Sequence, residues 1–358
     1  MILRPVAHHD LDALFSIAEE SGPGFTSLMP DRRLLADRIE QSIASFQANI
    51  TRPGDETYLF VLEDKDAGTL AGTTGIRAAV GQNTPIVHFR HTRVLSHTRA
   101  GRPRTLADTL TPCSHYRGCS EICSLYLRPA YRQAHAGKLL SRVRFLFMAL
   151  YPHRFANTVI AQMRGISGPE GQAPLWDSLR HLAADVDFVT ATQQLQNDPE
   201  AFIQTLPRGP LATDRLSASA RATLGQVHPD TRPALRLLEQ EGFRYQGLMD
   251  LLDGGPTVAC DRLQIASVRN TRRFRWPNAN AMSCPGILAN TGCADFRAAV
   301  ITGAPTPALL TDLHLDNGAE AACLPLPARA RLPGRQHHLS AKTQSAWKEP
   351  AQEASHGQ

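Results

Sequence analysis

The chain has 358 residues, of which 20% are charged and 42% are hydrophobic, an ordinary composition for a globular protein. Its formal net charge of +5 is modest and spread along the sequence, which does not indicate a nucleic-acid-binding protein. No apolar run approaches the ~18 residues of a membrane span, no signal peptide is recognisable and the seven cysteines form no regular framework, so we expect a cytoplasmic protein with reduced thiols that binds neither nucleic acid nor membrane.

The first 120 residues predict a strand, two helices and two further strands. Apolar alternation predicts the strands, and apolar residues at helical spacing predict the helices. The expected elements are a strand at 2–6, helices beginning at His9 and Asp31, and strands at 58–63 and 69–80 that are joined by a hairpin loop. Residues 81–120 are irregular in pattern and rich in Arg, His and Thr; they could hold one or two strands, for example around 87–89, and we assign none there.

A strand at 121–127, a basic turn and a helix up to residue 150 follow. Strict alternation places Ile122, Ser124 and Tyr126 on one face of that strand. The first N–H groups of the helix have no partner within it, and together with the helix dipole they suit a phosphate or pyrophosphate. Arg132 and Lys138 add positive charge at this turn. Taken alone, the pattern is more often that of an ordinary strand–helix connection with a solvated basic loop.

The rest of the chain predicts regular elements up to about residue 258 and then changes character. The expected elements are strands at 158–163 and 243–252 and helices at 176–182, 199–206, 217–224 and 233–241, the last followed by Gly242 at its C-terminus. From 259 to 335, many Pro, Gly and Arg residues with short apolar runs predict a small β-rich subdomain. The polar stretch 336–358 has no period, and we expect it to be disordered.

The mid-chain strand, basic turn and helix, with a later helix ending before a strand at Phe243, resemble the acyl-CoA N-acyltransferases of the Gcn5-related fold. More specifically, the chain resembles the arginine N-succinyltransferase family through short stretches that follow one another in the family's order. These stretches are 2–6 (ILRPV), 58–64 (YLFVLED), 121–127 (EICSLYL), 139–141 (LLS), 163–165 (MRG), 225–231 (GQVHPDT), 241–247 (EGFRYQG) and 250–256 (DLLDGGP), with a weaker one at 289–297.

This resemblance implies an α/β (α+β) fold with a mixed central sheet flanked by helices. It implies an acyltransferase domain at 1–258, a small β-rich C-terminal appendage at 259–335 and a tail at 336–358. The implied reaction transfers succinyl from succinyl-CoA to the α-amino group of L-arginine, the first step of succinyl-dependent arginine catabolism, with no tightly bound cofactor. The expected assembly is a homo-oligomer or a hetero-oligomer with a paralogous subunit.

For the site, the resemblance implies that His228 is the catalytic acid/base and that Leu125 lies at the succinyl-CoA site. The further residues expected to bind acyl-CoA are Tyr126, Leu127, Arg132, His135, Ala136, Gly137 and Lys138. The chemistry suits these roles, because histidine's ordinary pKa of about 6.5 lets it accept the amine's proton, and a backbone N–H near Leu125 can stabilise an oxyanion. A histidine before a proline is by itself more often a capping or surface residue; the heptapeptide 225–231 favours the catalytic reading.

Two departures from the family's pattern keep other functions open. His135 and Ala136 precede a single glycine where the family has two or more, which leaves a non-catalytic partner subunit or coenzyme-binding regulator as an alternative. Gln162 stands where the family has a glutamate, which leaves another amine, such as ornithine, or another acyl group as an alternative. The presence of His228 argues against the non-catalytic reading.

Acidic residues near these motifs are candidates for binding a guanidinium, because a carboxylate matches its two-pronged geometry. The candidates, none of which is assigned, are Glu121, Glu170, Asp250 and Asp253. The cysteines and the histidine at 113–123 match no common zinc spacing, and we expect no metal site.

We predict that deleting residues 336–358 leaves stability and activity unchanged, because the segment lacks apolar periodicity and such termini seldom contribute to a fold. The melting temperature and the rate of acyl transfer would be compared between the full chain and a chain that ends at residue 335. A clear loss of either in the shorter chain would contradict the prediction.

Overall fold

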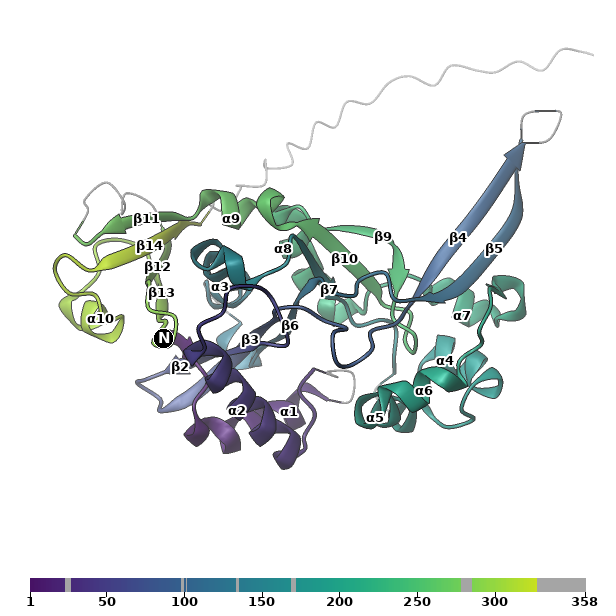
Figure 1. Ribbon diagram of the computed structural model, residues 1–358, viewed down its shortest axis with the longest axis horizontal. Helices are drawn as coiled ribbons and strands as arrows, with labels where there is room; N and C mark the ends of the chain where they lie inside the picture. The colour runs from purple at the N-terminus through teal and green to yellow at the C-terminus, as the bar shows by residue number, and fades with distance from the viewer. Residues whose placement is uncertain are drawn as a thin grey trace, which may run out of the picture. The chain divides into compact units, whose positions relative to one another are not determined.

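The computed structural model describes residues 1–326, except for 23–26, 98, 99, 101, 133, 134, 169–171 and 278–284. Residues 1–326 form one compact unit, in which helices flank a long sheet (Figure 1). The tail at 336–358, for which we predicted disorder, lies outside the described residues.

The described strands form a single sheet in the order β11-β14-β12-β13-β1-β2-β3-β6-β7-β10-β9-β4-β5-β8. The strands are β1 (Ile2–Pro5), β2 (Thr57–Asp64), β3 (Thr69–Arg77), β4 (His88–His97), β5 (Pro103–Cys113), β6 (Ser120–Leu127), β7 (Thr158–Gln162), β8 (Leu211–Ala212), β9 (Arg244–Met249), β10 (Pro256–Asp261), β11 (Arg272–Arg275), β12 (Gly286–Asn290), β13 (Ala298–Ile301) and β14 (Glu320–Pro325). Among the described strands, only β6 and β7 pair in parallel. The predicted mixed sheet is therefore confirmed.

Helices cover both faces of this sheet. The helices are α1 (Leu11–Ser21), α2 (Arg32–Gln47), α3 (Ala136–Leu150), α4 (Pro174–Leu179), α5 (Phe188–Asn197), α6 (Pro199–Thr205), α7 (Ala218–Thr223), α8 (Arg232–Glu241), α9 (Ala266–Asn270) and α10 (Pro307–Asp312). The helices α1 and α2 pack on one face, where Leu59 and Val61 of β2 meet them, and α3 packs on the other face against Phe60 and Leu62. Most predicted helices are confirmed within a few residues, while α5, α9 and α10 were missed.

The C-terminal strands extend the central sheet. Leu3 of β1 lies opposite Ala298 of β13, and β12, β14 and β11 continue outward from β13. The expected β content of this region is present. The expected domain boundary after residue 258 falls inside β10, and the described strands beyond it are continuous with the central sheet.

The segment 81–120 forms an arm. Its strands β4 and β5 pair along their whole length and project from the body of the molecule (Figure 1). The sequence left this segment without a firm assignment but allowed one or two strands, and two are present, the first beginning at His88. Towards the end of the arm both faces are exposed, as Val94 (46%) and Leu106 (61%) show, so the residues do not alternate between apolar and polar as in a half-buried strand.

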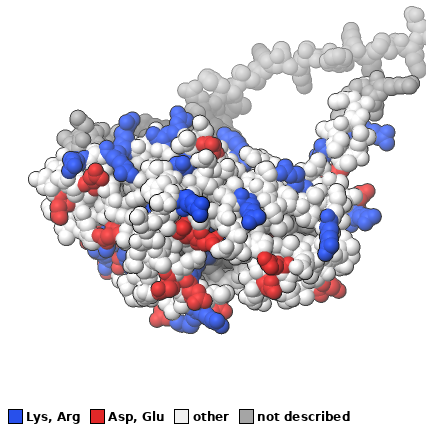
Figure 2. Space-filling model, in the orientation of Figure 1, with Lys and Arg blue, Asp and Glu red and all other residues white. Residues whose placement is uncertain are grey.

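The helix α3 is buried on nearly every side. It was predicted as an amphipathic helix, but residues on its other faces, including Arg142, Arg144 and Phe145, are buried as well, because α8 and α9 pack on it from outside the sheet. Arg142 forms an ion pair of 2.9 Å with the buried Glu241 at the end of α8. On the outer surface, the face seen in Figure 2 carries basic and acidic side chains that are interspersed.

The chain segment that follows β7 touches the segment that precedes β10. A β-carbon on Gly255 would lie 2.0 Å from the carbonyl oxygen of Met163 and 2.5 Å from the nitrogen of Gly165. The nitrogen of Gly165 donates to Asp253 Oδ2 at 2.7 Å, and the nitrogen of Gly255 donates to Asp253 Oδ1 at 2.8 Å. We call this contact of 163–165 with 253–255 the backbone crossing; only glycine allows it to be this close.

We predict that Gly255→Ala lowers the free energy of unfolding by about 1–3 kcal/mol, because the added methyl group forces the crossing apart. Urea unfolding of the variant and the parent protein measures the effect. Gly209→Ala is the matched control, since a β-carbon there meets nothing within 4 Å. Equal losses in the two variants would mean that the crossing yields without cost.

Candidate active site

The parallel strands β6 and β7 separate after a short stretch of pairing. Their register includes only Ser120 opposite Val159 and Glu121 opposite Ile160, although β6 continues to Leu127. From Ile122 onward, β6 pairs with β3 on one side and with no described strand on the other. The backbone groups on that open edge are free to meet a ligand.

A bulge on β6 lies at the open edge. The register with β3 shifts between Cys123 and Tyr126, and Ser124 has a positive φ of 53°. The hydroxyl of Thr73 donates to the carbonyl oxygen of Ser124 at 2.8 Å and so holds the bulge. The predicted strict alternation was wrong here, because the extra residue of a bulge changes which face the following side chains occupy.

After the bulge, Leu125 and Leu127 pack against the core on the α3 side, whereas Tyr126 packs against the core of α1 and α2. Of the three neighbouring residues predicted to contact acyl-CoA, Leu125 and Leu127 thus share a face, and Tyr126 lies on the opposite one. Their binding role stays a prediction.

The basic turn leads into α3, which begins at Ala136, three residues before the predicted start of its apolar pattern. Arg132 is exposed, and its Nε donates to the carbonyl oxygen of Leu127 at 3.1 Å, which anchors the guanidinium at the end of β6. A β-carbon on Gly137 would meet only Leu127, at 3.8 Å, so packing does not require glycine there. The Nδ1 atom of His135 is buried and has no hydrogen-bond partner among the described residues.

The other residues of the turn are placed less favourably for a direct contact or are not described. Ala136 is buried, and Lys138 is partly exposed on the first turn of α3. Residues 133 and 134 lie outside the described part of the chain. Arg132 and His135 precede α3 in the chain and Lys138 lies on its first turn, and the coenzyme-binding role of all three stays a prediction.

His228 is fixed at the end of β7. Its backbone N–H donates to the carbonyl oxygen of Arg164 at 2.9 Å, and Gly225 N donates to Gly254 O at 2.9 Å. The segment 225–228 is therefore hydrogen-bonded to both chain segments of the backbone crossing. The ring Nδ1 accepts a hydrogen bond from the N–H of Asp230 at 3.2 Å, and 17% of the side chain is exposed. This hydrogen bond from the backbone N–H of Asp230 fixes the orientation of the imidazole ring.

Burial lowers the pKa of His228 below its ordinary value, and the nearby charge of Arg164 lowers it further. The carboxylate of Asp230 and the backbone of Ser167 act in the opposite direction without reversing the shift. The imidazole is therefore neutral at pH 7, which is the protonation state that a general base requires.

A second polar group lies where β6 and β7 separate. Gln162 Nε2 donates to Glu121 Oε1 at 2.8 Å, and Arg77 of β3 forms an ion pair of 3.4 Å with the same carboxylate. The contacts of Glu121 show that it is a bridging residue between three strands.

His88, at the start of β4, is a buried histidine. Its ring packs edge-on against Tyr116, with centroids 5.3 Å apart, and burial lowers the pKa of His88.

The remaining candidate carboxylates have structural partners or are not described. Asp253 holds the backbone crossing, and burial together with the negative charge of Asp250 raises its pKa. Asp250 accepts hydrogen bonds from the N–H groups of Leu252 and Asp253 at 2.7 Å and 3.0 Å. Glu170 lies outside the described residues.

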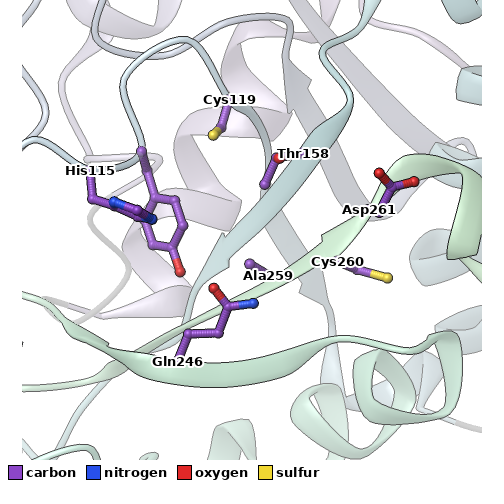
Figure 3. A pocket seen from close by; sticks show the side chains of 8 residues that line it. His115, Cys119, Thr158, Gln246, Ala259, Cys260 and Asp261 are labelled. Carbon is purple, nitrogen blue, oxygen red and sulfur yellow. The ribbon is translucent and has the colours of Figure 1, made fainter.

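Within the described part of the chain, no group of three or more His, Cys, Asp and Glu side chains is arranged to hold a metal ion. A pocket of about 340 Å³ lies at the start of β7, at the end opposite to Gln162 (Figure 3). Its lining residues are His115, Tyr116, Cys119, Thr158, Gln246, Ala259, Cys260 and Asp261. None of the residues predicted to bind coenzyme lines this pocket, so we keep it apart from the candidate site.

A family model described as the arginine N-succinyltransferase beta subunit matches residues 1–267 of the chain. The chain belongs to the arginine N-succinyltransferase family. This is a family of acyltransferases, and the resemblance deduced from short sequence stretches is confirmed.

Individual members of the family match most of the chain. The arginine N-succinyltransferase of Enterobacter sp. (strain 638) is 36% identical over 324 residues, which cover 88% of this chain and 93% of the relative. The enzyme of the same name from Citrobacter koseri is 35% identical over the same shares. The solved structure of arginine/ornithine succinyltransferase subunit AI from Pseudomonas aeruginosa has a TM-score of 0.80 and 29% identity, and the match covers 91% of this chain and 99% of that chain.

Sequence reasoning did not find Arg38, Arg77 or His88, which the structure places around β6. Arg38 sits on a helix with many charged residues, and His88 lies in the segment that had no readable pattern.

No described helix has both the length and the apolar character that crossing a membrane requires.

We predict that Arg132→Ala weakens the binding of CoA by about 1.5–3 kcal/mol, the range of a charge-assisted hydrogen bond, because this anchored guanidinium lies beside the N-terminus of α3. Direct calorimetric titration of CoA measures the dissociation constants. Arg208→Ala, at an exposed loop position, is the control for loss of one positive charge. If Arg132→Ala binds CoA as tightly as the parent protein, the diphosphate lies elsewhere.

Proposed function

We propose that the protein transfers succinyl from succinyl-CoA to the α-amino group of L-arginine, with His228 as the general acid/base. The observation that supports this most strongly is the combination of family membership with a neutral histidine fixed at the end of β7, next to the open edge of β6. The thioester is a co-substrate in this proposal, and no tightly bound cofactor is needed.

In the proposed reaction, the amine nitrogen attacks the thioester carbon, a C–N bond forms and the C–S bond breaks. The proton lost by the amine passes to His228, which then returns a proton to the departing thiolate. The negative charge that develops on the thioester oxygen is stabilised by a backbone N–H of the open edge near Leu125. The diphosphate of the coenzyme binds at the first turn of α3, with Arg132, His135 and Lys138 around it.

A second substrate is supported by two observations. The solved relative from Pseudomonas aeruginosa is named an arginine/ornithine succinyltransferase subunit, and Gln162 adds no charge at the separation of β6 and β7. Ornithine is therefore the alternative acceptor. Thiol release measured with succinyl-CoA or acetyl-CoA, each with arginine or ornithine, distinguishes these acceptors; no release with any pair favours a non-catalytic subunit.

We also propose a cytoplasmic location and an oligomeric assembly. The free thiols of residues such as Cys113 and Cys260 support the first, since cytoplasmic proteins keep cysteines reduced. The descriptions of the family model as a beta subunit and of the solved relative as subunit AI support the second, with a second copy or a paralogous chain as partner.

We predict that His228→Ala folds normally and loses about 10²–10⁴-fold in turnover, the usual contribution of a general base. Steady-state kinetics and the melting temperature measure the two effects. His153→Ala, at an exposed position, is the control. Turnover of the His228 variant within about threefold of the parent value would be far below that range and would remove the histidine from the mechanism.

The pH dependence gives an independent check. Because burial and Arg164 lower the pKa of His228, kcat/KM should rise with pH and level off through an inflection below pH 6.5. A profile with no inflection below pH 6.5 would mean that a different group is the base; a further inflection at alkaline pH belongs to the α-amino group of the acceptor.

A further inference from the structure

Arg38 of α2 reaches the bulge of β6 from the side opposite to α3. Its Nη2 donates to Ser124 Oγ at 2.9 Å and to Cys123 Sγ at 3.5 Å, and its Nη1 donates to the carbonyl oxygen of Ser27. The guanidinium therefore lies directly over the bulge that precedes Leu125, where the open edge begins.

The partners of Arg38 leave its positive charge without a counter-ion. All three acceptors are uncharged groups, its Nε is buried and has no hydrogen-bond partner, and none of the ion pairs between described residues includes it. Other partly buried arginines differ: Arg4 binds Asp10 and Glu63, and Arg142 binds Glu241. A half-buried guanidinium without a carboxylate is costly, which favours binding of an anion from outside the chain.

A second cation increases the positive potential near the bulge. Arg144 of α3 is fully buried, and its hydrogen bonds to described residues go to the carbonyl oxygen and hydroxyl of Ser141, at 3.0 Å and 3.3 Å. Burial lowers the pKa of Arg144 to about 10, and the two groups that oppose this shift are Cys123 and Glu241. Because Glu241 is already paired with Arg142, it only partly compensates the charge of Arg144.

We propose that Arg38 binds a carboxylate of a substrate. The inference rests on the proposed function, in which both substrates carry a carboxylate close to the reacting atoms: the free carboxylate of the succinyl group and the α-carboxylate of the amino acid. A guanidinium matches a carboxylate through two parallel N–H donors and is specific for that geometry. Ser124, which Arg38 contacts, directly precedes Leu125, so a carboxylate held there lies beside the predicted thioester position.

A purely structural role accounts for less of what is observed. Hydrogen bonds to Ser27 and Ser124 tie α2 to the bulge, and a neutral side chain could make such bonds equally well. The charge without a carboxylate partner among the described residues is the feature that a structural tie leaves unexplained. An anionic ligand that reaches the Nη atoms accounts for it.

The test compares Arg38→Gln with the parent protein and with Arg33→Gln, an exposed position on the same helix that undergoes the same change of charge. Transfer rates are measured with succinyl-CoA or acetyl-CoA as donor, and with arginine or agmatine as acceptor. Acetyl-CoA lacks the distal carboxylate of the donor, and agmatine lacks the α-carboxylate of the acceptor. Arg38→Lys is included because it keeps the charge and therefore retains part of any preference.

If Arg38 binds the succinyl carboxylate, Arg38→Gln lowers the preference in kcat/KM for succinyl-CoA over acetyl-CoA by roughly tenfold to a hundredfold. If it binds the amino-acid carboxylate, the preference for arginine over agmatine falls by that factor instead. Either outcome supports the proposal. Unchanged preferences for both pairs overturn it, whatever happens to the overall rate.

Binding measurements separate this inference from the proposed function. Titration of succinyl-CoA, acetyl-CoA, arginine and agmatine into each protein reports on Arg38 without turnover. A parent protein that transfers no acyl group refutes the proposed reaction. In that case, a selective loss of affinity for the carboxylate-bearing member of a pair still supports Arg38 as a carboxylate-binding residue, and equal affinities overturn it.

Discussion

The separation of β6 and β7 is the constraint on which the candidate site depends. Two parallel strands pair through evenly spaced hydrogen bonds, and each residue beyond the last pair has backbone groups that need another partner. Here, pairing with β7 ends at Glu121, and the remainder of β6 pairs with β3 and with no other described strand. The bulge at Ser124 lies on this open edge, and the basic turn and the start of α3 come after it in the chain. The backbone crossing beyond β7 holds His228 on the β7 side of the separation.

The same arrangement divides the charges around the site. Arg132 and Lys138 lie at the N-terminus of α3, whereas Arg38 lies over the bulge on the other face of the sheet. Glu121, Gln162 and Arg77 tie three strands together where the separation begins. In the low-dielectric interior these groups act over longer distances than on the surface, so a base such as His228 is sensitive to a cation as close as Arg164.

Local patterns predicted the elements whose two faces differ. Asp31 caps α2 and Gly242 ends α8 in the left-handed conformation, both as expected from helix-terminus preferences. The basic turn was also found from local pattern, whereas the role of His228 came from a family resemblance, since a single histidine before a proline has no pattern of its own. The bulge and the full burial of α3 could not be predicted, because each depends on contacts with segments far away in the sequence. The strands of the arm were not assigned for a different reason, since both faces are exposed towards the end of this local hairpin. Arg38 illustrates the same limit: its role is defined by the strand that it meets, and its own helix gives no sign of it.

The position of β1 within the sheet has a consequence for the order of folding. The first strand of the chain lies between β2 and β13, so that residues near the N-terminus pair with residues near the end of the described chain, such as Leu3 with Ala298. While a ribosome is still synthesising the protein, β1 and β2 can already form a sheet edge, but the strand that covers this edge has not yet been made. The nascent chain thus exposes the unpaired hydrogen-bonding groups of β1 for most of its synthesis, a period in which an edge strand is open to pairing with other chains.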